Sequence, residues 1–315
     1  MLTQALWFQV ILMTASLGIL YIGADLALAS AEKIGKAIGI SSLVVGLLIV
    51  GFGTSLPEFF VSHLACIHEK PGIALGNIIG SNVANLFLIM AIAGILVRLT
   101  FSTRDIIKQL ILHLVITILV FVIFKWINIL HWASFFILCG FFAWYLYFTF
   151  KKMEKHIHDE NEPKPKLNFI DIGKLLVGFI LLYVGGELLV YSGSSLGKIL
   201  GVSTFVISAI FVAFGTSFPE LMTVLVACIK KKDVNLITGN IIGSNIFNVG
   251  FVMGSISIYK VKLTETFYYE MAVLFFACFF LLLLAFMKKK FHRWSGVGFL
   301  LIYIGMVCYW VCCRG

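Results

Sequence analysis

The chain has 315 residues, of which 61% are hydrophobic and only 12% are charged, and its mean hydropathy is +1.04. These values lie far outside the range of soluble globular proteins, so a soluble enzyme or binding module is excluded. The formal net charge is +9, but the lysines and arginines lie in short stretches between apolar runs and form no nucleic-acid-binding motif. No nucleic-acid partner is therefore expected.

Apolar runs of about 20 residues recur along the whole chain, and each is long enough to cross a ~30 Å hydrocarbon core as a helix. We predict ten spans, near residues 4–29, 41–66, 73–97, 106–126, 129–150, 169–195, 203–228, 236–259, 266–287 and 295–313. The first is expected to be a true span and not a leader, because no Lys or Arg precedes Lys33. The predicted fold class is an all-α polytopic membrane protein with ten transmembrane helices.

The basic residues are distributed unevenly between the two ends of these spans. The connections after odd-numbered spans hold 17 lysines and arginines, the other connections and the C-terminus hold 6, and Lys174 lies within a span. Cytoplasmic connections carry the excess of positive charge in membrane proteins. We therefore expect a multi-pass protein of the cell (inner) membrane, embedded in the lipid bilayer, with both termini outside.

The chain contains the same pattern twice. Residues 21–58 align without gaps with residues 183–220, and the heptapeptide GNIIGSN occurs both at 76–82 and at 239–245. Because five spans precede the charged linker, the second half must enter the membrane from the opposite side, which makes an inverted repeat. The predicted units are a first five-helix repeat at 1–150 with its motif at 51–90, a cytoplasmic linker at 151–168, and a second repeat at 169–315 with its motif at 213–253.

A proline followed by a glutamate stands well inside the second and the seventh span. These pairs are Pro57 with Glu58 and Pro219 with Glu220. A proline within a span frees backbone carbonyls, which lipid tolerates only where the backbone is buried or lines a cavity. An intramembrane carboxylate is costly, and neither span has a Lys or Arg at comparable depth to neutralise it. These glutamates are therefore predicted to be functional.

The repeated heptapeptide supplies further polar side chains at a similar depth. Glu58 and Glu220 each lie about 15 Å from the end of their span at 1.5 Å per residue, which is half of the hydrocarbon core. Polar residues at i, i+4 and i+8 form two stripes, Asn77, Ser81 and Asn85 in one half and Asn240, Ser244 and Asn248 in the other. The pairs Gly76 with Gly80 and Gly239 with Gly243 predict a close approach of another helix beside each stripe.

Every polar group gathered at this depth is an oxygen donor. Carboxylates, hydroxyls, amide carbonyls and freed backbone carbonyls suit hard cations such as Ca²⁺, Mg²⁺ or Na⁺, and not zinc or copper. Two carboxylates also balance one divalent charge where an unpaired charge would be expensive. The residues alone therefore predict a midplane site for hard cations.

The paired motifs GTSLPE at 53–58 and GTSFPE at 215–220, each followed by GNIIGSN, resemble the two alpha repeats of the sodium/calcium exchanger family. The resemblance covers nearly the whole chain and is greatest to the short prokaryotic members of the calcium/cation antiporters. It implies an antiporter that exchanges Na⁺ for Ca²⁺ at alternating sites, with the long first and sixth helices sliding over the core.

The resemblance also implies which side chains bind the transported ions. The Ca²⁺ ligands would be Thr54, Glu58, Thr216 and Glu220. The Na⁺ and central positions would be Gly51, Ser55, Ser81, Asn85, Ala213, Ser217, Ser244 and Asn248. Potassium-dependent members have Asp at the position of Asn248, so potassium coupling is not expected here.

Other functions remain open at this point, with different support. An antiporter that uses H⁺, or one that carries another divalent cation, is compatible with the same motifs and charges. A channel is less well supported, because inverted halves that meet at one closed site favour alternating access. An enzyme is not expected, since no nucleophile and base can be assembled and GFGTS lacks the GK of a P-loop. No organic cofactor is expected.

Three further intramembrane residues have two possible roles each. Asp25 and Glu187 occupy equivalent positions in the two halves, where they could serve in ion access or in pairing of helices. His63 could couple protons to transport, but packing or a hydrogen bond to a neighbouring helix is the favoured interpretation.

Overall fold

The computed structural model describes residues 2–101, 103–126, 129–152, 165–201, 215–263 and 267–313. Within these ranges nine helices are long and apolar enough to cross a membrane. The shorter apolar helix Gly215–Ile229 falls in the second part of the seventh predicted span, whose residues 203–214 lie outside the described ranges. The prediction of a polytopic helical membrane protein is confirmed.

The spans are built from several consecutive helical segments. The first half contains α1 (Leu2–Ile38), α2 (Ser42–Val44), η1 (Val45–Val50), α3 (Gly51–Thr54), α4 (Leu56–Ile67), α5 (Pro71–Ala84), η2 (Asn85–Ile89), α6 (Met90–Leu96), β1 (Leu99–Thr100), α7 (Arg104–Trp126) and α8 (Trp132–Lys152). The second half contains α9 (Phe169–Ile199), η4 (Gly215–Ser217), α11 (Phe218–Ile229), α12 (Val234–Phe247), η5 (Asn248–Met253), α13 (Gly254–Ile256), η6 (Ser257–Tyr259), α14 (Tyr268–Phe286), β2 (Lys290–Phe291) and α15 (Arg293–Cys313).

Two kinds of irregularity interrupt the spans. Segments η1, η2 and η5 are π-helical turns, a form that is often found at functional sites. Helices α4 and α11 both begin after a serine in a non-helical conformation, Ser55 at φ −89° and ψ 8° and Ser217 at φ −88° and ψ 2°. Pro57 and Pro219 follow at the start of the new helix, where a missing N–H is tolerated. These breaks are the ones that the prolines predict.

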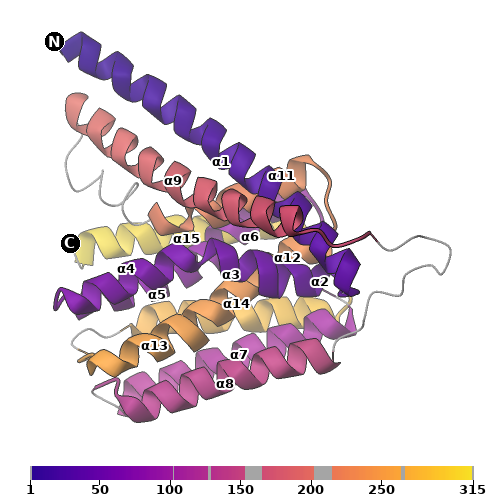
Figure 1. Ribbon diagram of the computed structural model, residues 1–315. Coiled ribbons are helices and arrows are strands. Elements are labelled where there is room, and N and C mark those ends of the chain that lie inside the picture. The colour runs from indigo at the N-terminus through magenta and orange to yellow at the C-terminus, as the bar shows by residue number, and fades with distance from the viewer. Residues whose placement is uncertain are drawn as a thin grey trace.

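Helices α1 and α9 form a pair that crosses the other helices obliquely (Figure 1). Small residues let the two backbones meet. A Cβ on Gly23 would lie 2.9 Å from Leu181 Cβ, and one on Gly178 would lie 2.7 Å from the amide nitrogen of Ala27. Contacts this short leave no room for a larger side chain, so the pair packs as a tight unit.

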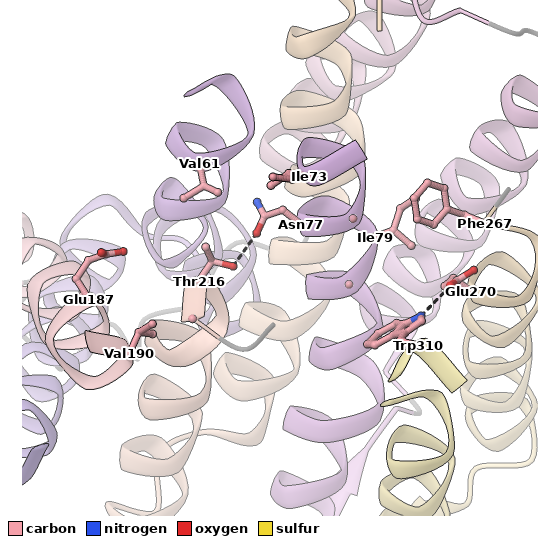
Figure 2. A pocket seen from close by; sticks show the side chains of 13 residues that line it. Val61, Ile73, Asn77, Ile79, Glu187, Val190, Thr216, Phe267, Glu270 and Trp310 are labelled. Carbon is pink, nitrogen blue, oxygen red and sulfur yellow. Dashed lines mark hydrogen bonds between the residues drawn. The ribbon is translucent and has the colours of Figure 1, made fainter. Parts of the chain in front are cut away.

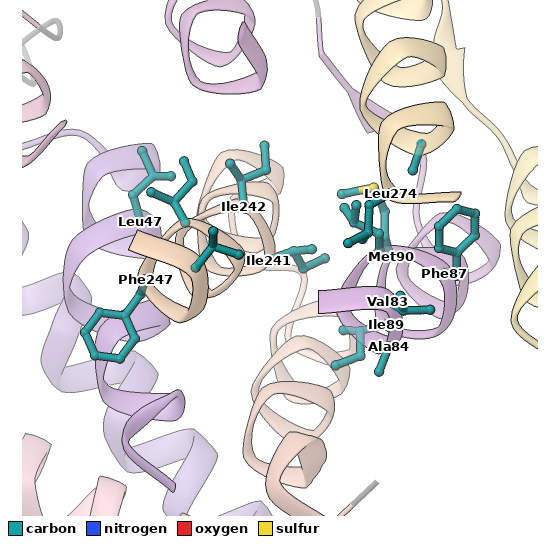
Figure 3. Packing of buried hydrophobic residues seen from close by; sticks show 14 of the residues in the cluster. Leu47, Val83, Ala84, Phe87, Ile89, Met90, Ile241, Ile242, Phe247 and Leu274 are labelled. Atoms are coloured by element: carbon teal, nitrogen blue, oxygen red, sulfur yellow. The ribbon is translucent and has the colours of Figure 1, made fainter. Parts of the chain in front are cut away.

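The remaining helices of the two halves interlock. Helix α7 packs against α14, α8 against η5 and α13, and α15 against α6 and η2 (Figure 1). Figure 3 shows buried apolar side chains at such places, with Leu47 of η1 near Ile242 of α12 and Met90 of α6 near Leu274 of α14. The only strands in the described residues are β1 and β2, a short antiparallel pair that joins the two halves and was not predicted.

Candidate cation site

The two intramembrane glutamates lie in the first turns of α4 and α11. Their exposed fractions are 0% for Glu58 and 1% for Glu220. The amino end of a helix carries a partial positive charge, which favours a carboxylate in this position. The proline breaks therefore place each acid where the backbone itself helps to hold its charge.

Several buried polar atoms of the motif residues make no close hydrogen bond. They are both carboxylate oxygens of Glu58, Oε2 of Glu220, Oγ of Ser217, Oδ1 of Asn85, and Oδ1 and Nδ2 of Asn248. Buried polar atoms in proteins are nearly always satisfied, and an unpaired buried charge is especially costly. A group of unpaired oxygens around two acids is a site that a cation would satisfy.

The other oxygen of Glu220 has a partner from the opposite half. Ser55 Oγ donates a hydrogen bond to Glu220 Oε1 at 2.8 Å. The break before α4 therefore contacts the acid of α11, which brings the two motifs into one site. Glu58 has no contact this short, and its side-chain partners are the hydroxyls of Ser81, Thr216 and Ser217.

Two asparagines, Asn77 and Asn240, each form hydrogen bonds with residues of both halves. We call each of these two groups of hydrogen bonds a bracket. Asn77 Oδ1 accepts from Thr216 Oγ1 at 3.0 Å, and Asn77 Nδ2 donates to Ser62 Oγ at 3.0 Å and to the carbonyl oxygen of Glu58 at 3.2 Å. Figure 2 shows the bond between Asn77 and Thr216. Each hydroxyl and amide here is thus held by a neighbouring helix.

The other half contains the equivalent bracket. Asn240 Nδ2 donates to Thr223 Oγ1 at 2.9 Å, and Asn240 Oδ1 lies 3.4 Å from Thr54 Oγ1. Thr54 Oγ1 also donates to the carbonyl oxygen of Val50 at 3.0 Å. The sequence placed Asn77 and Asn240 on polar stripes but did not identify them as members of the site.

The last asparagine of each GNIIGSN heptapeptide joins the two halves. Asn82 Nδ2 donates to the carbonyl oxygen of Asn245, and Asn245 Nδ2 donates to the carbonyl oxygen of Asn82, both at 3.4 Å. Asn85 Nδ2 donates to Asn245 Oδ1 at 2.9 Å. This reciprocal contact is the one expected where residues related by a two-fold axis meet. Sequence reasoning missed the role of Asn82 and Asn245, although their exact repetition was a signal.

The structure brings most of the predicted site residues together. Ser244 Oγ donates to the carbonyl oxygen of Gly51 at 3.2 Å, and Ser81 Oγ lies 3.3 Å from Thr216 Oγ1. The buried members are Gly51, Thr54, Ser55, Glu58, Ser81, Asn85, Ser217, Glu220, Ser244 and Asn248, and Thr216 is half-buried. Ala213 lies outside the described residues.

The glycine prediction holds in one of its two copies. A Cβ on Gly239 would lie 2.4 Å from the carbonyl oxygen of Leu43, and one on Gly243 would lie 2.3 Å from that of Leu47. In the first copy, no described atom comes within 4 Å of a Cβ on Gly76 or Gly80. The expected close approach is therefore not made there by any described residue.

Gly76 and Gly80 instead line a cavity of about 450 Å³ beside the site (Figure 2). Asn77 and Thr216 also line it, so the cavity reaches the bracket next to Glu58. Glu187 of α9 faces the same space. The access role that the sequence left open for Glu187 is thus compatible with its place.

The other residues with open roles are engaged in contacts. Asp25 forms an ion pair with Lys230, which is the helix-pairing role. His63 Nδ1 lies 2.9 Å from the carbonyl oxygen of Phe59, and its ring packs against Phe59 and Tyr259. These contacts support packing for His63.

Comparisons with known proteins agree along most of the chain. The model of the protein family "Sodium/calcium exchanger protein" matches residues 8–151 and 171–311. An uncharacterised membrane protein of Methanocaldococcus jannaschii is 32% identical over 91% of this chain and 92% of its own length. The sodium/calcium exchanger MaX1 of Methanosarcina acetivorans is 26% identical over 92% and 95%. The solved sodium-calcium exchanger NCX_Mj superposes with a TM-score of 0.84 at 31% identity, covering 96% of this chain and 99% of that structure.

Proposed function

Because this chain belongs to the sodium/calcium exchanger protein family, we propose that it exchanges Na⁺ for Ca²⁺ across the membrane by alternating access. The observation that carries the proposal is the group of buried, unpaired oxygens around Glu58 and Glu220. Two carboxylates of opposite repeats supply the charge of one divalent ion, and neutral oxygens surround them. An all-oxygen site of this kind selects hard cations.

Within this proposal, each group of ligands has its own ion. Ca²⁺ is held by Glu58 and Glu220 with the hydroxyls of Thr54 and Thr216. Na⁺ occupies the flanking positions, where Ser55, Ser81, Ser217 and Ser244 offer hydroxyls and Gly51 and Ala213 offer carbonyls. Asn85 and Asn248 line the centre. The contacts of Ser55 with Glu220 and of Ser81 with Thr216 support this arrangement, since they make neighbouring ion positions share ligands.

Shared ligands explain why the exchange would be coupled. A Ca²⁺ ion that draws both carboxylates toward it takes away the oxygen partners that a neighbouring Na⁺ would use, so the two kinds of ion compete. If either kind of ion satisfies the buried oxygens, the protein can close over the site, and open it to the other side, only when the site is filled. The tight pair α1 and α9 is the element that would move over the rest of the molecule, because it lies across the motif helices.

Ion flux into proteoliposomes tests the proposal. Radiolabelled Ca²⁺ uptake is followed while an outward gradient of Na⁺, K⁺ or H⁺ is imposed in separate experiments. We expect uptake with the Na⁺ gradient and none with K⁺ alone. Uptake driven by H⁺ and not by Na⁺ would establish the H⁺-coupled antiporter instead. Uptake that needs no counter-gradient and does not saturate would indicate a channel.

A further inference from the structure

Two stretches of the chain contain basic residues and no acid. The first includes Arg98, and the sequence has no Asp or Glu between Glu69 and Asp105. The second reads KKKFHRW at residues 288–294, and no Asp or Glu follows Glu270. Neither stretch belongs to the cation site, and both lie in connections whose excess of basic residues predicts the cytoplasmic side.

The strands β1 and β2 bring these two stretches together. Leu99 pairs with Phe291 in an antiparallel register, which sets the preceding Arg98 opposite the following His292. Phe291 is fully buried, and its ring lies so near Gly94 that a Cβ there would be 2.3 Å from Phe291 Cε1. The ribbon is therefore anchored, and the backbone of Arg98 and His292 beside it is held with it.

A pocket of about 460 Å³ lies between the end of α6 and the start of α15. Arg98, His292, Arg293 and Trp294 line it, and Trp294 is 79% exposed. The ion pairs found among the described residues include neither arginine, although four lysines, Lys33, Lys108, Lys230 and Lys232, are paired with acids. The pocket thus presents positive charge that no described carboxylate neutralises.

The start of α15 adds to this positive potential. The helix has 21 residues and begins at Arg293, so its first N–H groups and its partial positive charge lie at the pocket. Anions bind readily where such a helix end meets basic side chains. The pocket is suited to a phosphate group.

An apolar surface continues from the pocket along the span. Ile95 and Leu96 belong to the pocket wall and are 37% and 52% exposed, and Leu301 further along α15 is 63% exposed. Tryptophan is enriched where a membrane meets water, because its ring is apolar and its N–H is polar. A ligand that fits both parts has an anionic head and an apolar tail.

We propose that this pocket binds the headgroup of an anionic phospholipid, with Arg98 and Arg293 on the phosphate and an acyl chain along Ile95 and Leu96. Basic pockets between helices at a membrane surface are a known form of lipid recognition. The apolar wall favours a lipid over free phosphate, which would leave that wall uncovered. Because both repeats contribute to the pocket, a bound lipid would hold α6 and α15 together.

Thermal unfolding of the purified full-length protein in detergent tests the proposal, because a ligand that binds only the folded state raises the unfolding temperature. The probes are phosphatidylglycerol, phosphatidylcholine with the same acyl chains, and inorganic phosphate. We expect phosphatidylglycerol to bind at least tenfold more tightly than phosphatidylcholine, and phosphate to give no comparable shift. The double variant Arg98→Gln with Arg293→Gln should weaken phosphatidylglycerol binding roughly tenfold to thirtyfold, the scale for two basic side chains at an anionic surface.

Two controls separate this site from general attraction of charge. Arg98→Lys with Arg293→Lys keeps the charge and should keep most of the preference. Lys125→Gln with Lys260→Gln removes two exposed charges elsewhere and should keep all of it. If the double glutamine variant does not fold, Arg98→Gln alone gives the same comparison with a smaller loss. Equal binding of both lipids, a preference that survives loss of the arginines, or an equal response to free phosphate would overturn the proposal.

Discussion

At the scale of single residues, the two glutamates differ in their closest contacts. Glu220 accepts a hydrogen bond of 2.8 Å from Ser55, whereas neither oxygen of Glu58 has a contact this short and its side-chain partners are the hydroxyls of Ser81, Thr216 and Ser217. A buried carboxylate whose donors are not close depends on a cation, or on a proton, more than one that is closely bonded. In the proposed site, an ion would therefore contribute most to neutralising Glu58.

The first prediction concerns both acids. Glu58→Gln and Glu220→Gln should each reduce exchange at least a hundredfold. Each variant removes one of the two carboxylates that would balance a buried Ca²⁺, and breaking a buried pair of opposite charges costs roughly 3–5 kcal/mol. Radiolabelled Ca²⁺ uptake into proteoliposomes measures this loss. In a separate measurement, Ca²⁺ should raise the unfolding temperature of the wild-type protein and not of either variant.

Glu69→Gln is the control for these variants, because Glu69 is exposed in the turn between α4 and α5. This variant should exchange Na⁺ for Ca²⁺ at the wild-type rate. Uptake near the wild-type rate in Glu58→Gln or in Glu220→Gln would show that the site is assigned wrongly.

The second prediction concerns Asn248, which is fully buried with both side-chain polar atoms unpartnered. Asn248→Asp adds a third acid beside two others, and like charges at this depth cannot all stay ionised without an extra cation. The variant should therefore gain a dependence of exchange on pH or on K⁺, measured by Ca²⁺ flux with each gradient. Asn85→Asp, at the equivalent position of the first repeat, is the matched comparison. Unchanged pH and K⁺ dependence in Asn248→Asp would remove Asn248 from the ion site.

The sequence pattern points to the acids and hydroxyls of the candidate site but not to the hydrogen bonds of Asn77 and Asn240. A glutamate after a proline inside an apolar span is conspicuous, because nothing but function or a charged partner explains its cost. The partners of Asn77, Asn240, Asn82 and Asn245 depend on how the two halves meet, and amides can bond to many groups. Their roles become visible only when the helices are packed together.

At the scale of secondary-structure elements, α12 lies directly on the backbone of α2 and η1. The carbonyl oxygens of Leu43 and Leu47 occupy the places where Gly239 and Gly243 would carry a Cβ. This contact sets the position of Asn240 and Ser244, which share the helix with those glycines. The π-turns and the strands β1 and β2 were not predictable from the sequence, since no residue pattern in these segments distinguishes them from ordinary helix and connection.

The third prediction tests this contact. Gly243→Ala should destabilise the protein by roughly 1–3 kcal/mol, the usual effect of overpacking, because the new methyl group would meet backbone that cannot move aside easily. Thermal unfolding in detergent measures the change. Gly80→Ala is the control from the first repeat, where no described atom is within 4 Å of the added Cβ. If both variants lose the same stability, the contact of α12 with η1 is not what sets the cost.

At the scale of the whole molecule, the charge distribution makes a prediction about orientation. The turn between α4 and α5 should lie outside and the turn before β2 should lie inside, as the excess of basic residues indicates. On a background without cysteine, Glu69→Cys should react with a membrane-impermeant reagent on intact cells and Lys289→Cys should react only after the cells are opened. The opposite pattern would mean that the basic residues do not set the orientation here.

The ion pairs between α1 and the rest of the molecule lead to a last prediction. Lys230 and Lys232, in the turn after α11, pair with Asp25 and Glu32 of α1. The hydrogen bond to Asp25 raises the pKa of Lys230 above its ordinary value. On the side of the lysine, the contact is therefore fully made below that ordinary pKa and is lost as the pH rises through the raised pKa. If α1 and α9 move together over the core, these contacts must break on each transport cycle. They would therefore favour the conformation in which they are made.

Asp25→Asn combined with Glu32→Gln should shift the protein away from this conformation. Exposed ion pairs contribute up to about 1 kcal/mol each. The ratio of this conformation to the one without the ion pairs should therefore change by no more than roughly thirtyfold. The rate at which a thiol reagent modifies Ile73→Cys, which lines the cavity beside the site, should fall accordingly. Lys33→Gln is the control, because the pair of Lys33 with Asp171 joins α1 to α9 and both partners would move together. An equal change in the control, or none in the double variant, would show that the contacts with α1 do not govern the movement of the α1 and α9 pair.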